Sequence, residues 1–144
     1  MDSTVLADML EEIAAADQGI DSVTIIRNGY MVLDTTFHPF PPATKHIIHS
    51  CTKSIVGTLI GVAIGDGLIK DVNERVVDLL PAAISEAARP AKADITVEHL
   101  LTMSSGLQCR DSYLYDWVGL NEMRASDDWA VHVPGLPMVE DPGA

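Results

Sequence analysis

The chain has 144 residues and is acidic, with 9 basic and 21 acidic side chains giving a formal net charge of −12 at pH 7. With 47% hydrophobic residues, it has the composition of one globular domain rather than of a disordered chain. The negative charge opposes contact with phosphate backbones and anionic lipid surfaces, so we expect neither nucleic acid nor a membrane as a partner.

Several other classes find no support in the sequence. The first residues lack a basic segment followed by an apolar one, which is the pattern of a secretory signal, so we expect a cytoplasmic protein. The longest apolar run, ending before Asp66, is too short to span a bilayer. Cys51 and Cys109 do not make a disulfide framework or a zinc site, and no further ligand accompanies His46-x-x-His49. We therefore expect no metal and no cofactor.

The chain opens with a helix and a hairpin. Apolar residues recur at helical spacing from about residue 3 to residue 16, which predicts an amphipathic helix. Two β-rich runs, residues 22–27 and 30–35, flank Asn28-Gly29, a strong signal for a type I′ turn. We expect the helix to pack on this hairpin, and the Pro-containing segment 38–45 that follows to be irregular.

The next predicted element is a helix that Ser50 opens and Gly65-Asp66-Gly67 ends. From residue 54 to residue 64 nearly every side chain is apolar or small, which predicts a helix buried on all sides. Such a helix would hold the residues at its start rigidly, as catalysis requires.

Two short helices are predicted further along. Asp71-x-x-Glu74 resembles a capping box before a short helix that Pro81 ends. A strand end at Ile95 leads into a helix capped by Thr96 and terminated by residues 104–106. We expect His99 on the outer face of that helix.

Ser50 and Lys53 form the candidate catalytic pair. A separation of three in a helix brings two side chains to neighbouring positions, so hydroxyl and amine can meet. Lysine acts as a base only if its pKa falls, and both the apolar helix and the positive end of the helix dipole would lower it. The alternative is that Ser50 caps the helix and Lys53 is a solvated residue of the first turn, and the bare Ser-x-x-Lys pattern favours this alternative.

Four segments in order resemble the β-lactamase-related serine hydrolases, most closely the class C β-lactamase-like esterases, amidases and DD-peptidases. They are SCTKS (50–54), GVAIGDGLI (61–69), VVDLLP (76–81) and ITVEHLLTMSSGL (95–107). The resemblance implies an α+β fold of the β-lactamase and penicillin-binding-protein type. It also implies that Ser50 is the acyl-accepting nucleophile, that Lys53 is its base, and that the Ser50 N–H contributes to the oxyanion hole.

Two further motifs of that family have no counterpart in the chain. One is a Tyr-x-Asn, which Tyr113-Leu114-Tyr115 does not match, and the other is a Lys/His-x-Gly on a later strand. Residues 1–144 therefore look like the N-terminal part of one such domain, which we expect to fold poorly and to be inactive by itself.

The stretch 108–135 allows two interpretations. Its aromatic residues, including Tyr113, Tyr115, Trp117 and Trp129, could overhang a substrate pocket. The interpretation we favour is a solvated surface loop held to the core by the two tryptophans. Asp127-Asp128 could also cap a short helix beginning at Trp129.

The sequence leads to one expected function and two alternatives. We expect an enzyme that forms an acyl intermediate on an ester, amide or lactam carbonyl of a small-molecule substrate. The alternatives are a penicillin-binding or peptidoglycan-recognising protein, and a non-catalytic paralogue or inert fragment. Fold alone does not choose the substrate.

Overall fold

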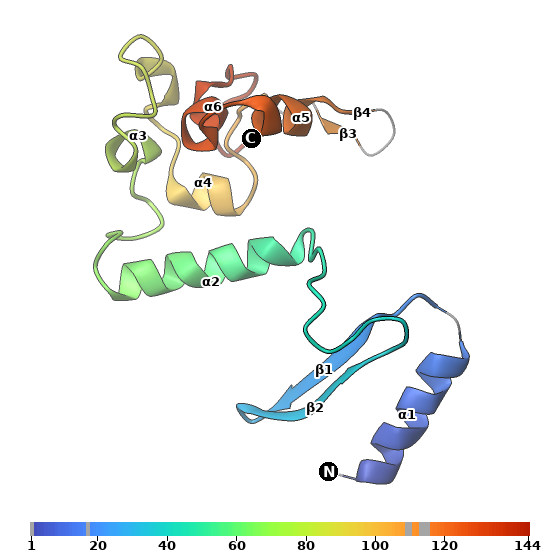
Figure 1. Ribbon diagram of the computed structural model, residues 1–144. Helices are drawn as coiled ribbons and strands as arrows, with labels where there is room; N and C mark the ends of the chain where they lie inside the picture. The colour runs from blue at the N-terminus through green and yellow to red at the C-terminus, as the bar shows by residue number, and fades with distance from the viewer. Residues whose placement is uncertain (1, 17, 109–110, 113–115) are drawn as a thin grey trace. The chain divides into compact units, whose positions relative to one another are not determined.

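A computed structural model describes residues 2–16, 18–108, 111–112 and 116–144 of the chain. The chain divides into two compact units, residues 1–49 and 50–144. The first contains a helix and a hairpin, and the second contains the remaining elements (Figure 1). In the part of the chain that the structure describes, no helix combines the length and the apolar character needed to cross a membrane.

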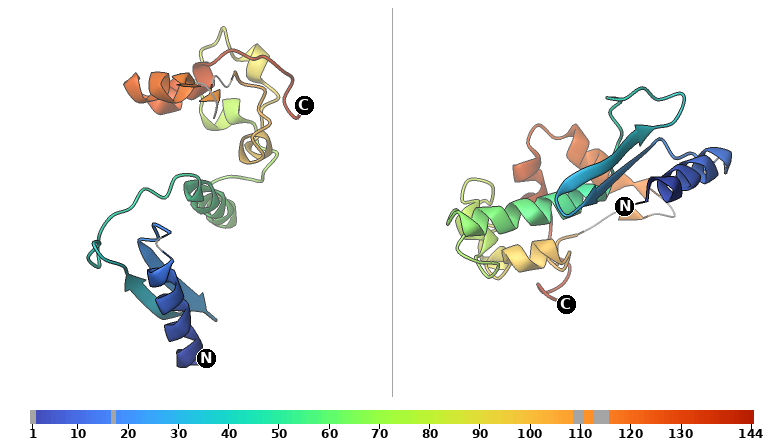
Figure 2. Two further views of the ribbon diagram at one scale, coloured as in Figure 1. Left: turned by 90° about the vertical axis from the view of Figure 1, so that its right-hand side faces the viewer. Right: turned by 90° about the horizontal axis from the view of Figure 1, so that it is seen from below.

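The first unit confirms the predicted helix and hairpin. Helix α1 spans Ser3–Ala15 and is capped by Asp2, whose side chain accepts a hydrogen bond from the Thr4 N–H at 2.9 Å. Strands β1 (Ser22–Arg27) and β2 (Tyr30–Thr36) pair antiparallel. The helix lies alongside the hairpin (Figures 1 and 2). Four of the five apolar residues of the predicted face are half-buried, namely Leu6, Met9, Leu10 and Ile13, while the fifth, Val5, is 63% exposed.

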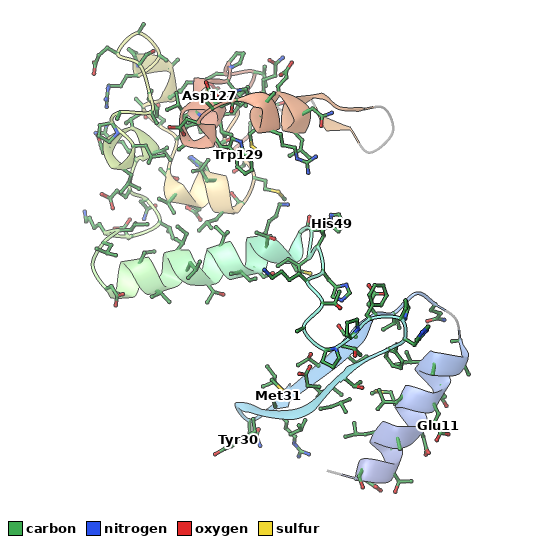
Figure 3. All side chains as sticks on the ribbon, viewed as in Figure 1. Glu11, Tyr30, Met31, His49, Asp127 and Trp129 are labelled. Atoms are coloured by element: carbon green, nitrogen blue, oxygen red, sulfur yellow. The ribbon has the colours of Figure 1, made fainter. Side chains whose placement is uncertain are left out.

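The hairpin turn has the backbone that Asn-Gly was expected to provide. Asn28 has a φ of 51° and Gly29 a φ of 78°, which is the left-handed pair that a type I′ turn needs. A register shift between Ile25 and Ile26 makes the pairing irregular near the turn. The side chains at the tip project outward (Figure 3), with Tyr30 76% and Met31 63% exposed.

The second unit begins with helix α2, Cys51–Gly65, with Ser50 as its N-cap and Asp66 as its C-cap. Gly67 follows with a φ of 72°, so the predicted Gly-Asp-Gly stop is confirmed. The prediction that α2 is buried on all sides is wrong, because no residue of α2 is buried. Its apolar character reflects a surface that the described elements leave uncovered: Leu59 is 59% and Val62 53% exposed.

The core of the second unit lies between two short helices. Helix α3 (Val76–Leu79) and helix α4 (Val97–Leu101) are joined by backbone hydrogen bonds from Val76 N–H to the Ile95 carbonyl at 2.9 Å and from Val97 N–H to the Glu74 carbonyl at 3.1 Å. The buried apolar residues gather around this junction: Val76, Val77, Ile84, Ile95 and Val97. Burial of these side chains stabilises the unit.

The Asp71–Glu74 segment does not cap α3 as we predicted. Asp71 accepts from the Asn73 N–H at 2.7 Å, and Glu74 accepts from the Lys70 N–H at 2.6 Å, so the two carboxylates close a separate turn. The N-cap of α3 is Arg75, whose side chain makes no capping bond. The turn ends before the helix because the backbone at residues 74–76 pairs with residues 95–97 instead.

The C-terminal part of the second unit is more helical than the sequence indicated. A 3₁₀ turn, η1, spans Pro90–Lys92, and two-residue strands β3 (Asp111–Ser112) and β4 (Asp116–Trp117) pair antiparallel. Helices α5 (Val118–Ala125) and α6 (Trp129–Gly135) follow. The expectation of a surface loop over 108–135 is therefore wrong for residues 118–125 and 129–135, where the backbone satisfies its hydrogen bonds within helices.

Candidate active site

Ser50 stands at the N-cap position of α2 without acting as a side-chain cap. Its backbone has φ −70° and ψ −10°, which is helical, and its hydroxyl makes no capping hydrogen bond. The capping residues Thr96 and Asp128 differ, because each has an extended backbone and accepts hydrogen bonds from the following turn. The interpretation of Ser50 as a capping side chain is thus wrong, and its hydroxyl oxygen is left for another partner.

Lys53 supplies that partner. Its Nζ donates to the Ser50 Oγ at 3.2 Å, and its backbone N–H donates to the Ser50 carbonyl at 3.0 Å. The helical backbone at Ser50 makes this possible, because it gives residues 50 and 53 the relative position of neighbours on one helix face. The predicted meeting of hydroxyl and amine is present in the structure. Both side chains are exposed.

The chain enters α2 through an uncommon backbone conformation. His49, immediately before Ser50, has a φ of 43°, in the left-handed region that residues other than glycine seldom adopt (Figure 3). The first N–H groups of a helix lack partners within the helix and point toward its start. By this rule the N–H groups of Cys51 and Thr52 would be donors near the Ser50 hydroxyl, whereas the N–H of Lys53 donates to the Ser50 carbonyl.

His99 and His46 make contacts outside the Ser50–Lys53 pair. The prediction that His99 lies on the outer face of α4 is wrong: His99 is half-buried, its Nδ1 accepts from the Thr96 N–H at 3.3 Å, and its own N–H donates to Thr96 Oγ1 at 3.3 Å. The two residues form a reciprocal cap. In the first unit, His46 Nδ1 lies 3.0 Å from Asp21 Oδ2. The described residues contain no cluster of potential metal ligands.

The aromatic and cysteine residues are only partly described. Tyr113, Tyr115 and Cys109 lie outside the described residues, as does the side chain of Trp117. Trp129 is 54% exposed, so it is not the buried anchor that we favoured. The predicted helix at Trp129 is confirmed, with Asp128 Oδ1 accepting from the N–H groups of Ala130 at 2.8 Å and Val131 at 3.3 Å.

Two basic residues in the alanine-rich segment escaped the sequence analysis. Arg89 donates from Nη1 to the Val77 carbonyl at 2.9 Å and from Nη2 to the Pro81 carbonyl at 3.3 Å. Lys92 is 3% exposed and donates to the Leu136 carbonyl. No sequence pattern singled them out, because their partners lie 12 and 44 residues away in the chain.

The fold and the pair at the start of α2 define a class of mixed α+β proteins with a serine and a lysine three residues apart at a helix start. A family model described as Beta-lactamase matches residues 8–139. The chain therefore belongs to the beta-lactamase family, and with it to hydrolases of the serine acyl-enzyme type. No curated protein matches the chain.

Proposed function

We propose that Ser50 and Lys53 are the catalytic residues of this protein, and that it hydrolyses an ester, amide or lactam bond of a small molecule. The observation that carries the proposal is the 3.2 Å contact between Lys53 Nζ and Ser50 Oγ, together with the absence of a capping role for that hydroxyl. Family membership supports the same chemistry in its general form.

The proposed reaction has two steps. Lys53, as the neutral amine, takes the hydroxyl proton while Ser50 Oγ attacks the carbonyl carbon, and the proton then passes to the departing alkoxide or amide nitrogen. The bond between the carbonyl carbon and the leaving group breaks, which leaves the acyl group on Ser50. In the second step Lys53 takes a proton from water as the water attacks this ester, the bond between the carbonyl carbon and Ser50 Oγ breaks to release a carboxylic acid, and Lys53 passes the proton from water to Ser50 Oγ. N–H groups at the start of α2 would stabilise the oxyanion in both steps.

Covalent labelling of the intact protein tests the assignment of the nucleophile. A fluorophosphonate probe should form an adduct on Ser50, located by mass mapping, and Ser50→Ala should abolish that adduct. Ser54→Ala is the matched control, because Ser54 is an exposed serine on the same helix and its hydroxyl is not part of the proposed site. An adduct on another residue, with Ser50 unlabelled, would overturn the proposal.

Steady-state rates separate the enzyme from a non-catalytic member of the family. In the full-length protein, we expect Ser50→Ala to lower kcat/KM for p-nitrophenyl acetate by at least about 10³-fold, and Lys53→Ala to lower it by about 10²- to 10⁴-fold. Ser54→Ala should retain the wild-type rate. Equal rates in wild type and Ser50→Ala would favour the non-catalytic alternative.

A further inference from the structure

A groove of about 430 Å³ runs beside the helix that carries Ser50 and Lys53. It lies between α2 on one side and α3 and α4 on the other (Figure 1). All described residues that line it are apolar, among them Val56 and Ile60 of α2, Leu79 of α3 and Leu101 of α4. Val56 is 46% and Leu101 42% exposed, so a molecule in solution can reach the groove.

The groove begins one helical turn beyond the candidate catalytic lysine. Val56 is three residues after Lys53, so the two are separated by about 60° around the helix axis and about 4.5 Å along it. Ile60 is seven residues after Lys53 and lies within about 20° of the same line. Because Lys53 Nζ reaches Ser50 Oγ at 3.2 Å, the methylene stem of Lys53 extends apolar surface from the groove toward that hydroxyl.

The position of the groove determines which part of a substrate it can hold. In the proposed reaction Lys53 gives a proton to the departing oxygen or nitrogen, so this atom must come within hydrogen-bond reach of Lys53 Nζ. The departing group therefore lies on the Lys53 side of Ser50. A chain attached to that group can follow the Lys53 stem toward Val56, whereas the acyl group is being bonded to Ser50 Oγ.

We propose that the groove binds an apolar chain on the departing group, so that the substrates are esters of medium-length alkyl alcohols. This inference rests on the proposed function, because it places the reacting carbonyl carbon at Ser50 Oγ. A hydrocarbon chain fits the groove, since neither has a polar group that would lose a hydrogen bond on burial. Each methylene group of the chain that is buried contributes a factor of about four in affinity.

The spacing along α2 predicts the length of the chain. Val56 is six residues after Ser50, which corresponds to about 9 Å along the helix axis. An extended chain advances about 1.2 Å per bond, so about seven bonds are needed to reach Val56. A butyl group is too short, whereas the end of an octyl group enters the groove. With octyl acetate, the acetyl group passes to Ser50, octanol leaves with the proton from Lys53, and water then releases acetic acid.

Release of acid by the full-length protein, measured at constant pH, tests the proposal with two pairs of isomeric esters. We expect kcat/KM for octyl acetate to exceed that for butyl acetate by about tenfold, the contribution of one to two buried methylene groups. Ethyl octanoate and ethyl butanoate are isomers of these acetates that carry the chain on the acyl side, and they should show no such difference. Equal values for the two acetates, or an equal preference between the two ethyl esters, would overturn the proposal.

Substitutions in the two walls locate the chain. Val56→Asn should reduce the ratio of octyl to butyl acetate at least about fourfold, the contribution of one methylene group. Val62→Asn is the matched control: the two valines are 46% and 53% exposed on α2, but Val62 is nine residues after Lys53 and hence on the opposite side of the helix. Leu101→Asn alters the α4 wall and keeps the test available if Val56→Asn does not fold. An unchanged ratio in a folded groove variant, or an equal fall in Val62→Asn, would contradict the assignment of the chain to this groove.

Ser50→Ala separates this inference from the proposed function. The variant should no longer hydrolyse butyl acetate, while calorimetric titration should still give a Kd for octyl acetate about tenfold below that for butyl acetate. Hydrolysis at the wild-type rate in Ser50→Ala would contradict the proposed function and this inference with it. Loss of hydrolysis with equal Kd values for the two acetates would contradict the inference alone.

Discussion

Ser50 occupies the N-cap position of α2 but has a helical backbone, and this combination determines which group its hydroxyl contacts. An N-cap serine usually has an extended backbone and turns its hydroxyl to the N–H groups of the following turn. Ser50 has φ −70° and ψ −10° and instead meets Lys53 Nζ. The sequence predicts the spacing of the pair. Whether the Ser50 hydroxyl caps the helix or contacts Lys53 depends on the ψ angle of Ser50, which the sequence leaves open.

At the same scale, Lys92 should make stability depend on pH. Because burial lowers its pKa, the folded chain binds fewer protons than the unfolded chain between that lowered pKa and 10.5, the value of a solvated lysine. The free energy of unfolding therefore rises with pH in this window. Below the lowered pKa both states are protonated, and the folded state bears the whole unfavourable free energy of burying the charge.

Denaturant unfolding of wild type and Lys92→Met, from neutral pH to 10.5, measures this contribution. The variant lacks the titrating group, so its stability advantage over wild type should shrink as the pH rises. Other groups that titrate in this range cancel in the difference between the two proteins. A difference that stays constant over the whole range would contradict the prediction.

At the scale of elements, the sequence predicted the structure correctly where a short motif favours one backbone conformation. Asn28-Gly29 correctly predicted the hairpin turn, and Asp128 correctly predicted the start of α6. Helix α5 and the end of α6 were harder to predict, because Gly119 and Pro134 interrupt short sequences that carry no long periodic pattern. Pro134 is buried near the end of α6, where packing against the core compensates for its poor helix propensity.

Gly106 is the element-scale position where a small substitution should have a large effect. It has a φ of 75°, and a Cβ built on it would overlap the carbonyl oxygen of Glu140. Gly67 is a matched control, because its φ is 72° and no atom lies within 4 Å of the corresponding position. The two glycines separate backbone strain from steric overlap.

Thermal and denaturant unfolding should therefore rank the two alanine variants. Gly67→Ala should cost about 1 to 2 kcal/mol of stability, from the left-handed backbone alone. Gly106→Ala should cost this amount and about 1 to 3 kcal/mol more, because the strand-like contact between residues 106 and 139–140 must shift. Equal losses of stability in the two variants would contradict the prediction, because they would mean that the backbone near Glu140 shifts without a loss of free energy.

At the scale of the whole molecule, the exposed apolar face of α2 is the main feature. Ile55, Val56, Leu59 and Val62 are 46% to 59% exposed. Exposed apolar surface of this kind promotes association. We predict that the 144-residue chain associates with increasing concentration, and that Leu59→Lys reduces this association.

Sedimentation velocity over a range of concentrations measures the effect. Leu68→Lys is the control, because Leu68 is 77% exposed but lies beyond the end of α2. It introduces the same charge without altering the α2 face. A chain that stays monomeric at all concentrations, or equal effects of the two substitutions, would contradict the assignment of association to α2.

The sequence by itself determined the hairpin, the boundaries of most helices and the spacing of Ser50 and Lys53, since each depends on residues close together in the chain, and it indicated the family through four segments in order between residues 50 and 107. Only the tertiary structure decided the remaining features. The exposure of α2, the burial of Lys92 and the cap formed by His99 depend on which distant segments come together. Lys92 is buried by the contact of an alanine-rich segment with α6, more than forty residues later. Local residue patterns cannot carry that information, because burial is a property of neighbours in space.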